Sequence, residues 1–197
     1  MTEPSLHPLV GQISPLARRF RRLADLDAAA YAAVARTPTP SAVDSALRTL
    51  SHTANHSKIS LSIAALLATR PGPPRQAAVA GVSAVALASA SANLLAKRLA
   101  RRHRPPRAEP GLFPRRYVVM PRSASFPSGH TASAVAFAVA VGRVLPGAAV
   151  PLGALAAVVG YSRVHTGVHY PGDVVGGAVL GAASAAVVLR VRRGVES

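Results

Sequence analysis

Thirteen residues near the C-terminal end of the chain collect side chains that carry out nucleophilic and acid–base chemistry. The stretch YSRVHTGVHYPGD, residues 161–173, places Arg163, His169 and Asp173 between apolar runs rich in alanine and valine. Its Tyr-Pro-Gly turn can fold Asp173 back to within hydrogen-bond reach of His169. A carboxylate on one ring nitrogen of a histidine fixes the tautomer and leaves the other nitrogen unprotonated and nucleophilic. The stretch therefore favours an imidazole with one unprotonated ring nitrogen, supported by a carboxylate and with a guanidinium nearby.

A second stretch, FPSGHTAS at residues 126–133, has the pattern of a helix start that binds anions. Pro127 opens the helix, and Ser128 and Gly129 place a hydroxyl and unobstructed backbone N–H groups at its N-terminus. Such an end attracts an anion through its exposed donors and the helix dipole. His130 lies in the first turn and points at whatever the amides hold. The alternative is an ordinary serine N-cap followed by a surface histidine.

A third stretch, KRLARRHRP at residues 97–105, concentrates positive charge. On a helix, Lys97, Arg101 and Arg104 fall at i, i+4 and i+7, which makes one cationic face. Pro105 ends that helix and pushes Arg104 toward an extended conformation. A forked guanidinium beside an ammonium group suits the non-bridging oxygens of a phosphate. The alternative is a basic stretch near the membrane that binds lipid charge.

Together the three stretches resemble the signature of the type-2 phosphatidic acid phosphatase superfamily, which includes lipid phosphate phosphatases and vanadium haloperoxidases. That signature is a lysine, six residues and Arg-Pro; then Pro-Ser-Gly-His; then Ser-Arg, five residues, a histidine, three residues and an aspartate. Every position is filled between Lys97 and Asp173. One such motif is weak evidence, but three in order argue strongly against a chance match. Residues 1–75 carry no part of the signature.

The resemblance implies a role for each matching residue. His169 is then the nucleophile that forms a phosphohistidine, Asp173 orients it, and His130 is the general acid that later activates water. The residues expected to hold the phosphoryl oxygens are Lys97, Arg104, Ser128, Gly129 and Arg163. No metal or other cofactor is expected. The chain has only 7 acidic residues, and Mg²⁺ sites need several carboxylates.

The sequence predicts an all-α, multi-pass membrane bundle of about five to six helices. These helices must position the residues named above, and the active site is expected at one membrane face. Half of the 197 residues are apolar, and the net charge is +16. Gln76–Ala96 is long enough to cross a bilayer, and apolar runs follow at 131–145, 148–161 and 174–191. The first two of these runs are short for a full span. An alanine-rich soluble bundle is the alternative.

The sequence predicts two parts of the chain. Residues 1–40 read as a polar tail and a basic amphipathic helix, and residues 41–197 as the phosphatase-like helical domain. The helix, 15–35, carries four arginines ahead of Leu23 and Leu26. It is either a soluble surface helix or a helix that lies on anionic lipid.

Several other histidines lie at positions where a function is conceivable from the sequence. A helix from about residue 42 is expected to continue through LSHTANHSK, residues 50–58, into the apolar run that follows. His52 and His56 would then lie at i, i+4, a spacing that can bind zinc. No carboxylate or third histidine accompanies them, so an interface pair is favoured. Asn55 and His56 are candidates for lining the substrate cleft. His165, with Tyr161, is expected to be an interface residue.

We interpret the chain as a metal-independent membrane phosphatase that acts on a phosphorylated lipid in the cytoplasmic membrane of a bacterium. The candidate substrates are phosphatidate, phosphatidylglycerol phosphate, polyprenyl phosphate or diphosphate, and a polyprenyl-linked sugar phosphate. The alternatives are a soluble acid phosphatase, a vanadate-dependent haloperoxidase, and a non-enzymatic basic membrane protein. Aromatic residues make up 4%, too few for the stacking platforms of single-strand nucleic-acid binders. The arginine count does not assign the membrane side, because several arginines have a catalytic reason to be there.

Overall fold

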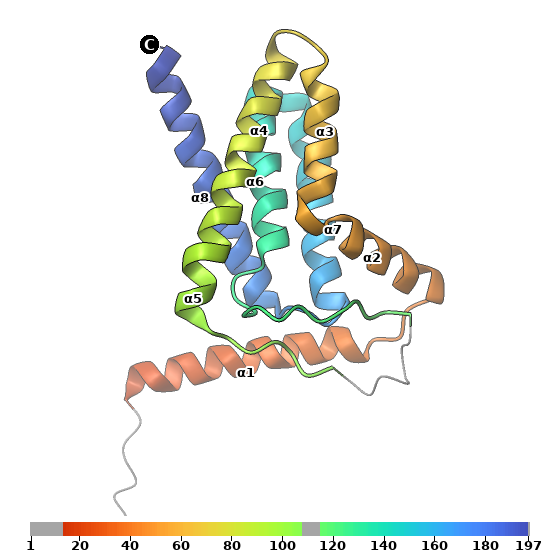
Figure 1. Ribbon diagram of the computed structural model, residues 1–197. Coiled ribbons are helices and arrows are strands. Elements are labelled where there is room, and N and C mark those ends of the chain that lie inside the picture. The colour runs from red at the N-terminus through yellow and green to blue at the C-terminus, as the bar shows by residue number, and fades with distance from the viewer. Residues whose placement is uncertain (1–13, 108–114, 197) are drawn as a thin grey trace, which may run out of the picture.

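This computed structural model describes residues 14–107 and 115–196, and most of these residues are helical (Figure 1). Within these ranges no strand occurs, which confirms the predicted all-α class. The helices are α1 (Pro15–Arg36), α2 (Ser41–Thr53), α3 (Lys58–Ala68), α4 (Pro73–Ala90), α5 (Lys97–Ala100), α6 (Gly129–Val144), α7 (Ala149–His165) and α8 (Pro171–Glu196). Shorter 3₁₀ or π-helical segments cover Asn55–Ser57, Ser91–Ala96 and Pro146–Ala148. Of the predicted polar tail, residues 1–13 lie outside the described part.

Three helical stretches of the described chain are long and apolar enough to cross a membrane. They are Pro73–Leu94, Pro146–His165 and Pro171–Gly194. The first and third cover most of the predicted spans at 76–96 and 174–191. α6, predicted to be short for a span, has 16 residues. It packs against α4, α7 and α8 in the middle of the bundle.

α6 packs closely against its neighbours because small residues line the contacts. Alanines four residues apart, from Ala80 to Ala88 on α4 and from Ala132 to Ala140 on α6, are fully buried. α8 contributes glycines: a Cβ added at Gly181 would lie 2.3 Å from the carbonyl oxygen of Ala132. Small residues allow membrane helices to approach this closely. The packing brings the N-terminal ends of α6 and α8 together, and both ends carry predicted site residues.

Replacing Gly181 by alanine should lower the free energy of unfolding by about 1–3 kcal/mol, the usual cost of overpacking a close contact. The obstacle is the backbone of α6, which cannot move aside as a flexible side chain would. Gly153→Ala on α7 is the matched control, because a Cβ there meets nothing within 4 Å. Thermal unfolding in detergent should rank the variants in this order. Equal midpoints for the two variants would contradict the close packing of α6 and α8.

The predicted continuous helix from residue 42 into the apolar run after residue 58 is wrong. The chain breaks at Asn55–Ser57, where His56 and Ser57 both have φ 56°. Two successive residues in the left-handed region end α2 and redirect the chain into α3 (Figure 1). His52 and His56 therefore do not share one helix, and the described residues contain no cluster of three or more candidate metal ligands.

α1 and α2 are joined to the bundle by a buried polar network. Arg116, with no exposed surface, donates to Asp44 at 3.1 Å and to the carbonyl oxygen of Ala35 at 3.0 Å. His165 Nε2 lies 2.7 Å from the same carboxylate. Burial alone would raise the pKa of Asp44, but hydrogen bonds from Thr39 and His165 and the charge of Arg116 lower it. His165 is thus an interface residue, as predicted.

Candidate active site

The start of α8 holds Asp173 in a fixed position. Pro171 occupies the first turn, where a missing N–H costs nothing. Asp173, which has no exposed surface, accepts a hydrogen bond from the backbone N of Tyr170 at 2.9 Å. A first-turn carboxylate that reaches back to the preceding N–H is one half of a capping box. The Pro-Gly-Asp sequence therefore starts the helix and also places its carboxylate one turn from His169.

His169 lies between this carboxylate and a guanidinium. Its Nδ1 is 3.5 Å from Oδ2 of Asp173, and its Nε2 is 3.3 Å from a terminal nitrogen of Arg104. A guanidinium only donates hydrogen bonds, so Nε2 must be the acceptor in that contact. The ring proton then sits on Nδ1, on the side of the carboxylate. This geometry agrees with the predicted pairing of His169 and Asp173, although the Nδ1–Oδ2 approach is long for a hydrogen bond.

The surroundings of His169 keep its imidazole neutral. Its pKa falls from 6.5 to about 4, chiefly because burial disfavours the charged ring. The hydrogen bond and charge of Asp173 oppose this shift, and the positive charges of Arg104 and Arg163 reinforce it. A neutral imidazole whose Nε2 carries no proton is the form in which histidine acts as a nucleophile.

The pKa of His169 predicts the acid limb of activity. Because neutral His169 persists down to about pH 4, kcat/KM should fall only as the pH drops through that region. The phosphomonoester itself titrates with a second pKa of about 6, so rates are best expressed per substrate dianion. On that scale we expect no fall in activity from pH 7 to about pH 5. A limb near the ordinary histidine value of 6.5 would contradict the buried, neutral ring.

A chain of ion pairs extends from Asp173 to α1, and sequence reasoning missed it. Arg102 donates to Oδ1 of Asp173 at 2.9 Å and to Oδ2 of Asp27 at 2.7 Å. Oδ1 of Asp27 accepts a hydrogen bond from the backbone N of Gly172 at 2.7 Å. The hydroxyl of Ser125 donates to Oδ2 of Asp173. The carboxylate of Asp173 is therefore held on several sides, and Asp27 holds both Arg102 and the first turn of α8.

The prediction of one cationic helical face across Lys97, Arg101 and Arg104 is wrong. α5 ends at Ala100, and Arg101 has φ 42°, so the later residues leave the helix. Arg104 instead donates to the carbonyl oxygen of Val168 at 2.7 Å, beside His169. Lys97 begins α5, but its side chain lies outside the described part of the structure.

Arg163 brings a second guanidinium to His169 from the end of α7. Its side chain is 2% exposed and donates to the backbone oxygen of Ser51 at 3.1 Å and to the hydroxyl of Ser51. Its Nε has no hydrogen-bond partner among the described residues. Buried polar groups are normally paired. The unpaired Nε of Arg163 is therefore suited to a phosphate oxygen.

The start of α6 joins the second motif to the third. Oγ of Ser128 caps the helix by accepting from the backbone N of Thr131 at 3.4 Å. The backbone N of Ser128 donates to the carbonyl oxygen of Asp173 at 2.9 Å. Gly129 is the first helical residue, so the prediction that Pro127 opens the helix is wrong, whereas His130 lies in the first turn as predicted. Ser128 thus caps α6, and that cap lies beside the residue whose carboxylate supports His169.

His130 faces Asn55 across a cleft. Its Nε2 lies 2.8 Å from the amide oxygen of Asn55, which only accepts, so Nε2 carries a proton. Asn55, His56, Gly129 and His130 all line one cavity of about 220 Å³. Asn55 and His56 thus line the same cleft as His130, and their place in a substrate cleft stays a prediction. The break between α2 and α3 supplies both residues.

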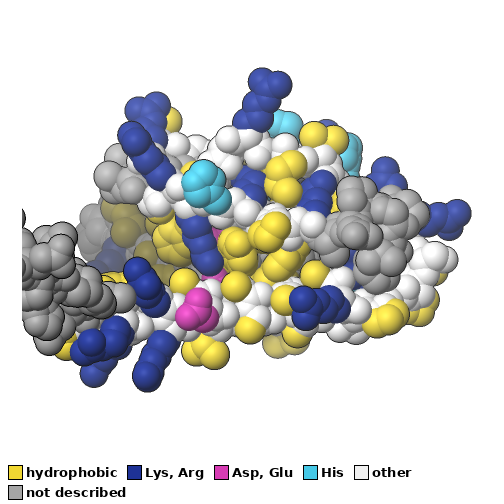
Figure 2. Space-filling model, turned by 90° about the horizontal axis from the view of Figure 1, so that it is seen from below, with side chains coloured by type: hydrophobic (Ala, Val, Ile, Leu, Met, Phe, Trp, Pro, Cys, Tyr) yellow, Lys and Arg dark blue, Asp and Glu magenta, His cyan; other side chains and the backbone are white. Residues whose placement is uncertain are grey.

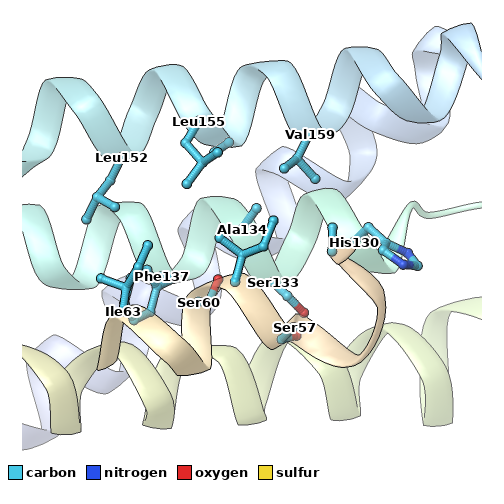
Figure 3. A pocket seen from close by; sticks show the side chains of 13 residues that line it. Ser57, Ser60, Ile63, His130, Ser133, Ala134, Phe137, Leu152, Leu155 and Val159 are labelled. Atoms are coloured by element: carbon cyan, nitrogen blue, oxygen red, sulfur yellow. The ribbon is translucent and has the colours of Figure 1, made fainter. Parts of the chain in front are cut away.

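An apolar groove leads from His130 into the bundle. It runs between α3, α6 and α7, and Figure 3 shows His130 at one end with Ile63, Phe137 and Leu152 toward the other. The residues between them are mostly small or aliphatic. The space inside it is only about 20 Å³, so a hydrocarbon chain would enter only if the lining side chains moved apart.

The end of the bundle that holds these residues is strongly basic. A depression next to Arg104 is lined by Arg98, Arg101, Arg102, His103 and Arg122. Figure 2, which looks at this end from below, shows lysine and arginine side chains gathered across it. Clustered cations raise the local concentration of anionic ligands. The arrangement can attract a phosphate to the end of the bundle where Arg104 and His169 lie.

Comparison with known proteins agrees with this geometry. The family model described as the PAP2 superfamily matches residues 77–196. Decaprenylphosphoryl-5-phosphoribose phosphatase from Mycobacterium tuberculosis is 39% identical over 145 residues, which are 72% of this chain and 76% of that protein. The protein of the same name from Mycolicibacterium smegmatis is 37% identical over 66% of this chain and 68% of its own length.

Two solved membrane enzymes share the fold. A transmembrane PAP2-type phosphatidylglycerolphosphate phosphatase from Bacillus subtilis superposes with a TM-score of 0.69 at 23% identity, over 88% of this chain and 87% of its own. Aquifex aeolicus LpxE superposes with a TM-score of 0.64 at 22% identity, over 81% and 92% of the two chains. At these identities the likeness shows the fold alone.

Proposed function

The chain belongs to the PAP2 superfamily and is a membrane-bound lipid phosphate phosphatase, and on that premise we propose that His169 is its nucleophile and a polyprenyl-linked sugar phosphate its substrate. The observation that carries the first part is the setting of His169. Its Nε2 lone pair faces a guanidinium at 3.3 Å, and its Nδ1 faces a carboxylate at 3.5 Å. An oxyanion held by Arg104 would lie directly before that lone pair.

In the first step, Nε2 of His169 attacks the phosphorus in line with the ester oxygen. The N–P bond forms as the P–O bond breaks, and protonated His130 gives its proton to the departing oxygen. The guanidiniums of Arg104 and Arg163, with the α6 N-terminus at Ser128 and Gly129, stabilise the charge on the phosphoryl oxygens. Lys97 would add an ammonium group to this set, as the motif implies.

In the second step, water attacks the phosphohistidine. His130 takes the proton of the water, the N–P bond breaks, and inorganic phosphate leaves with the lone pair restored to Nε2 of His169. Asp173 stabilises the positive charge on the imidazole while the phosphoryl group is attached. Each side chain returns to its starting form, and the built-in cations do the work that a metal ion does in other phosphatases.

The choice of substrate rests on the groove and on the relatives. The narrow apolar groove between α3, α6 and α7 ends at His130, and it would have to widen to admit a hydrocarbon chain. The curated relatives at 37–39% identity act, by name, on a decaprenyl-linked phosphoribose. A long isoprenoid chain in the groove would place its sugar phosphate at the basic end of the bundle. We place the enzyme in the cytoplasmic membrane of a bacterium, where such lipids lie.

A phosphate-release screen with purified protein in detergent and EDTA tests this function. The panel comprises phosphatidate, phosphatidylglycerol phosphate, polyprenyl diphosphate, a polyprenyl-linked phosphosugar and a soluble aryl phosphate. We expect the phosphosugar lipid to be turned over fastest and its KM to fall as the prenyl chain lengthens. Preference for the aryl phosphate, or a strict need for Mg²⁺, would overturn the proposal.

Asp27 is expected to act as a positioning residue through Arg102. Asp27→Asn removes the charge that holds Arg102, so Arg102 orients Asp173 less well. We expect kcat to fall about tenfold with KM unchanged, since roughly 1–2 kcal/mol is usual for such a partner. Asp25→Asn is the matched control, because Asp25 is exposed on the same helix. Equal activity of the two variants, or a change confined to KM, would contradict this role.

A further inference from the structure

α1 carries a largely apolar stripe, and no part of the described chain covers the N-terminal half of this stripe. Positions 16, 20, 23, 27, 31 and 34 recur every three or four residues, so they lie along one face of the helix. Toward the C-terminal end of this stripe Tyr31 is buried, and Asp27, whose side chain is 13% exposed, pairs with Arg102. At its N-terminal end Leu16, Phe20 and Leu23 are 61–63% exposed. The same face of α1 therefore packs against protein in the C-terminal half and is exposed in the N-terminal half.

The depth of α1 relative to the spans indicates what lies against that bare half. Asp27 binds the backbone N of Gly172, in the first turn of the span Pro171–Gly194. The ring of Tyr31 meets that of Tyr170, with centroids 5.6 Å apart. α1 thus lies where the spans begin, across the end of the bundle and roughly perpendicular to it (Figure 1). In a membrane protein this is the level of the lipid headgroups.

Charge on α1 complements an anionic surface. Arg18, Arg19, Arg21 and Arg22 are all exposed and flank the apolar stripe or lie opposite it. Guanidiniums near a negatively charged leaflet each contribute about 1 kcal/mol of attraction. Soluble proteins rarely leave several large apolar side chains in a row exposed. The pattern of leucine and phenylalanine on one face with arginine on the others is typical of helices that lie in the membrane interface.

We propose that the first half of α1, residues 15–26, is an interfacial membrane anchor that inserts Leu16, Phe20 and Leu23 among the acyl chains of an anionic leaflet. The arginines of this anchor bind lipid phosphates at the level of the headgroups. Since α1 also holds the first turn of α8 through Asp27, the anchor fixes the catalytic end of the bundle at the depth where lipid phosphates lie. The surface is separate from the catalytic groups and its partner is the bilayer itself.

The absence of tryptophan from the chain makes a direct test simple. Phe20→Trp introduces a single indole on the proposed buried face, and Ala29→Trp places one on the exposed opposite face of the same helix. Both variants are reconstituted into nanodiscs that contain phosphatidylglycerol and phosphatidylcholine with brominated acyl chains. We expect the indole at position 20 to show blue-shifted emission and to lose most of it to bromine quenching. The indole at position 29 should behave as one in water.

Three results would overturn the proposal that residues 15–26 anchor the chain in the membrane interface. Identical emission and quenching at the two positions would show that α1 does not lie in the interface. A blue shift at position 20 without bromine quenching would indicate a protein partner, such as a second copy of the chain. Equal quenching in discs of neutral lipid alone would remove the role of the arginines. Because the readout is fluorescence, none of these results depends on whether the proposed phosphatase chemistry is right.

Discussion

Replacing His169 by glutamine should lower kcat by about 10⁴-fold or more, the size of loss seen when a catalytic nucleophile is removed. Glutamine can fill much of the space of the buried ring, but its amide is too weak a nucleophile to form a bond to phosphorus. The backbone N of residue 169, which donates to the carbonyl oxygen of Arg163 at 3.2 Å, is unaffected. Steady-state phosphate release from the phosphosugar lipid measures the loss, and thermal unfolding in detergent checks that the fold remains.

His52→Gln is the matched control for this variant, because His52 is exposed on α2. It should retain wild-type turnover. A His169→Gln protein that keeps most of its activity would mean that the nucleophile is another residue. Loss of activity together with a collapsed thermal midpoint would assign His169 a structural role instead.

Replacing His130 by asparagine should have an effect that depends on the leaving group. An alkyl or sugar oxygen leaves poorly without a proton, so turnover of a lipid phosphate should fall about 10²–10⁴-fold, the usual range for a general acid. An activated aryl oxygen needs no such proton. Rapid mixing of the variant with an aryl phosphate should therefore release one equivalent of the phenol in a burst, followed by slow turnover, because His130 is also missing as the base for water.

His56→Asn is the control for this experiment, since His56 lines the same cleft as His130. It should show normal turnover with both substrates. Equal losses for the alkyl and aryl substrates, with no burst, would contradict the assignment of His130 as the acid. Fast turnover of the aryl phosphate that continues beyond the first equivalent would mean that another group activates the water.

The motif residues could be predicted from sequence because their spacing is fixed by local geometry. Pro171 and Asp173 start a helix one turn after His169, so the carboxylate and the ring meet without help from distant parts of the chain. In the same way Ser128 caps α6 and sets His130 in its first turn. Interactions between residues three or four positions apart can be recognised from the sequence pattern.

The supporting residues were not predictable in this way. Arg102 is one of several arginines in KRLARRHRP, and only the tertiary structure shows that it bridges Asp27 and Asp173, which are far apart in the chain. Asn55 reaches His130 because the chain breaks there, and no glycine or proline in LSHTANHSK announces that break. The presence of Asp27 in an arginine-rich helix, on the same stripe as Tyr31, is the one signal that could have drawn attention to it.

The central claim is that phosphate passes through a covalent bond to Nε2 of one histidine, and trapping that species tests it most directly. The His130→Asn protein is mixed with an aryl phosphate, quenched in alkali during the burst, digested, and sequenced by mass spectrometry. Our account predicts one phosphate per chain, on His169 and not on His165, which is a near neighbour in the sequence. A phosphate on any other residue, or a burst with no phosphorylated peptide, would contradict it.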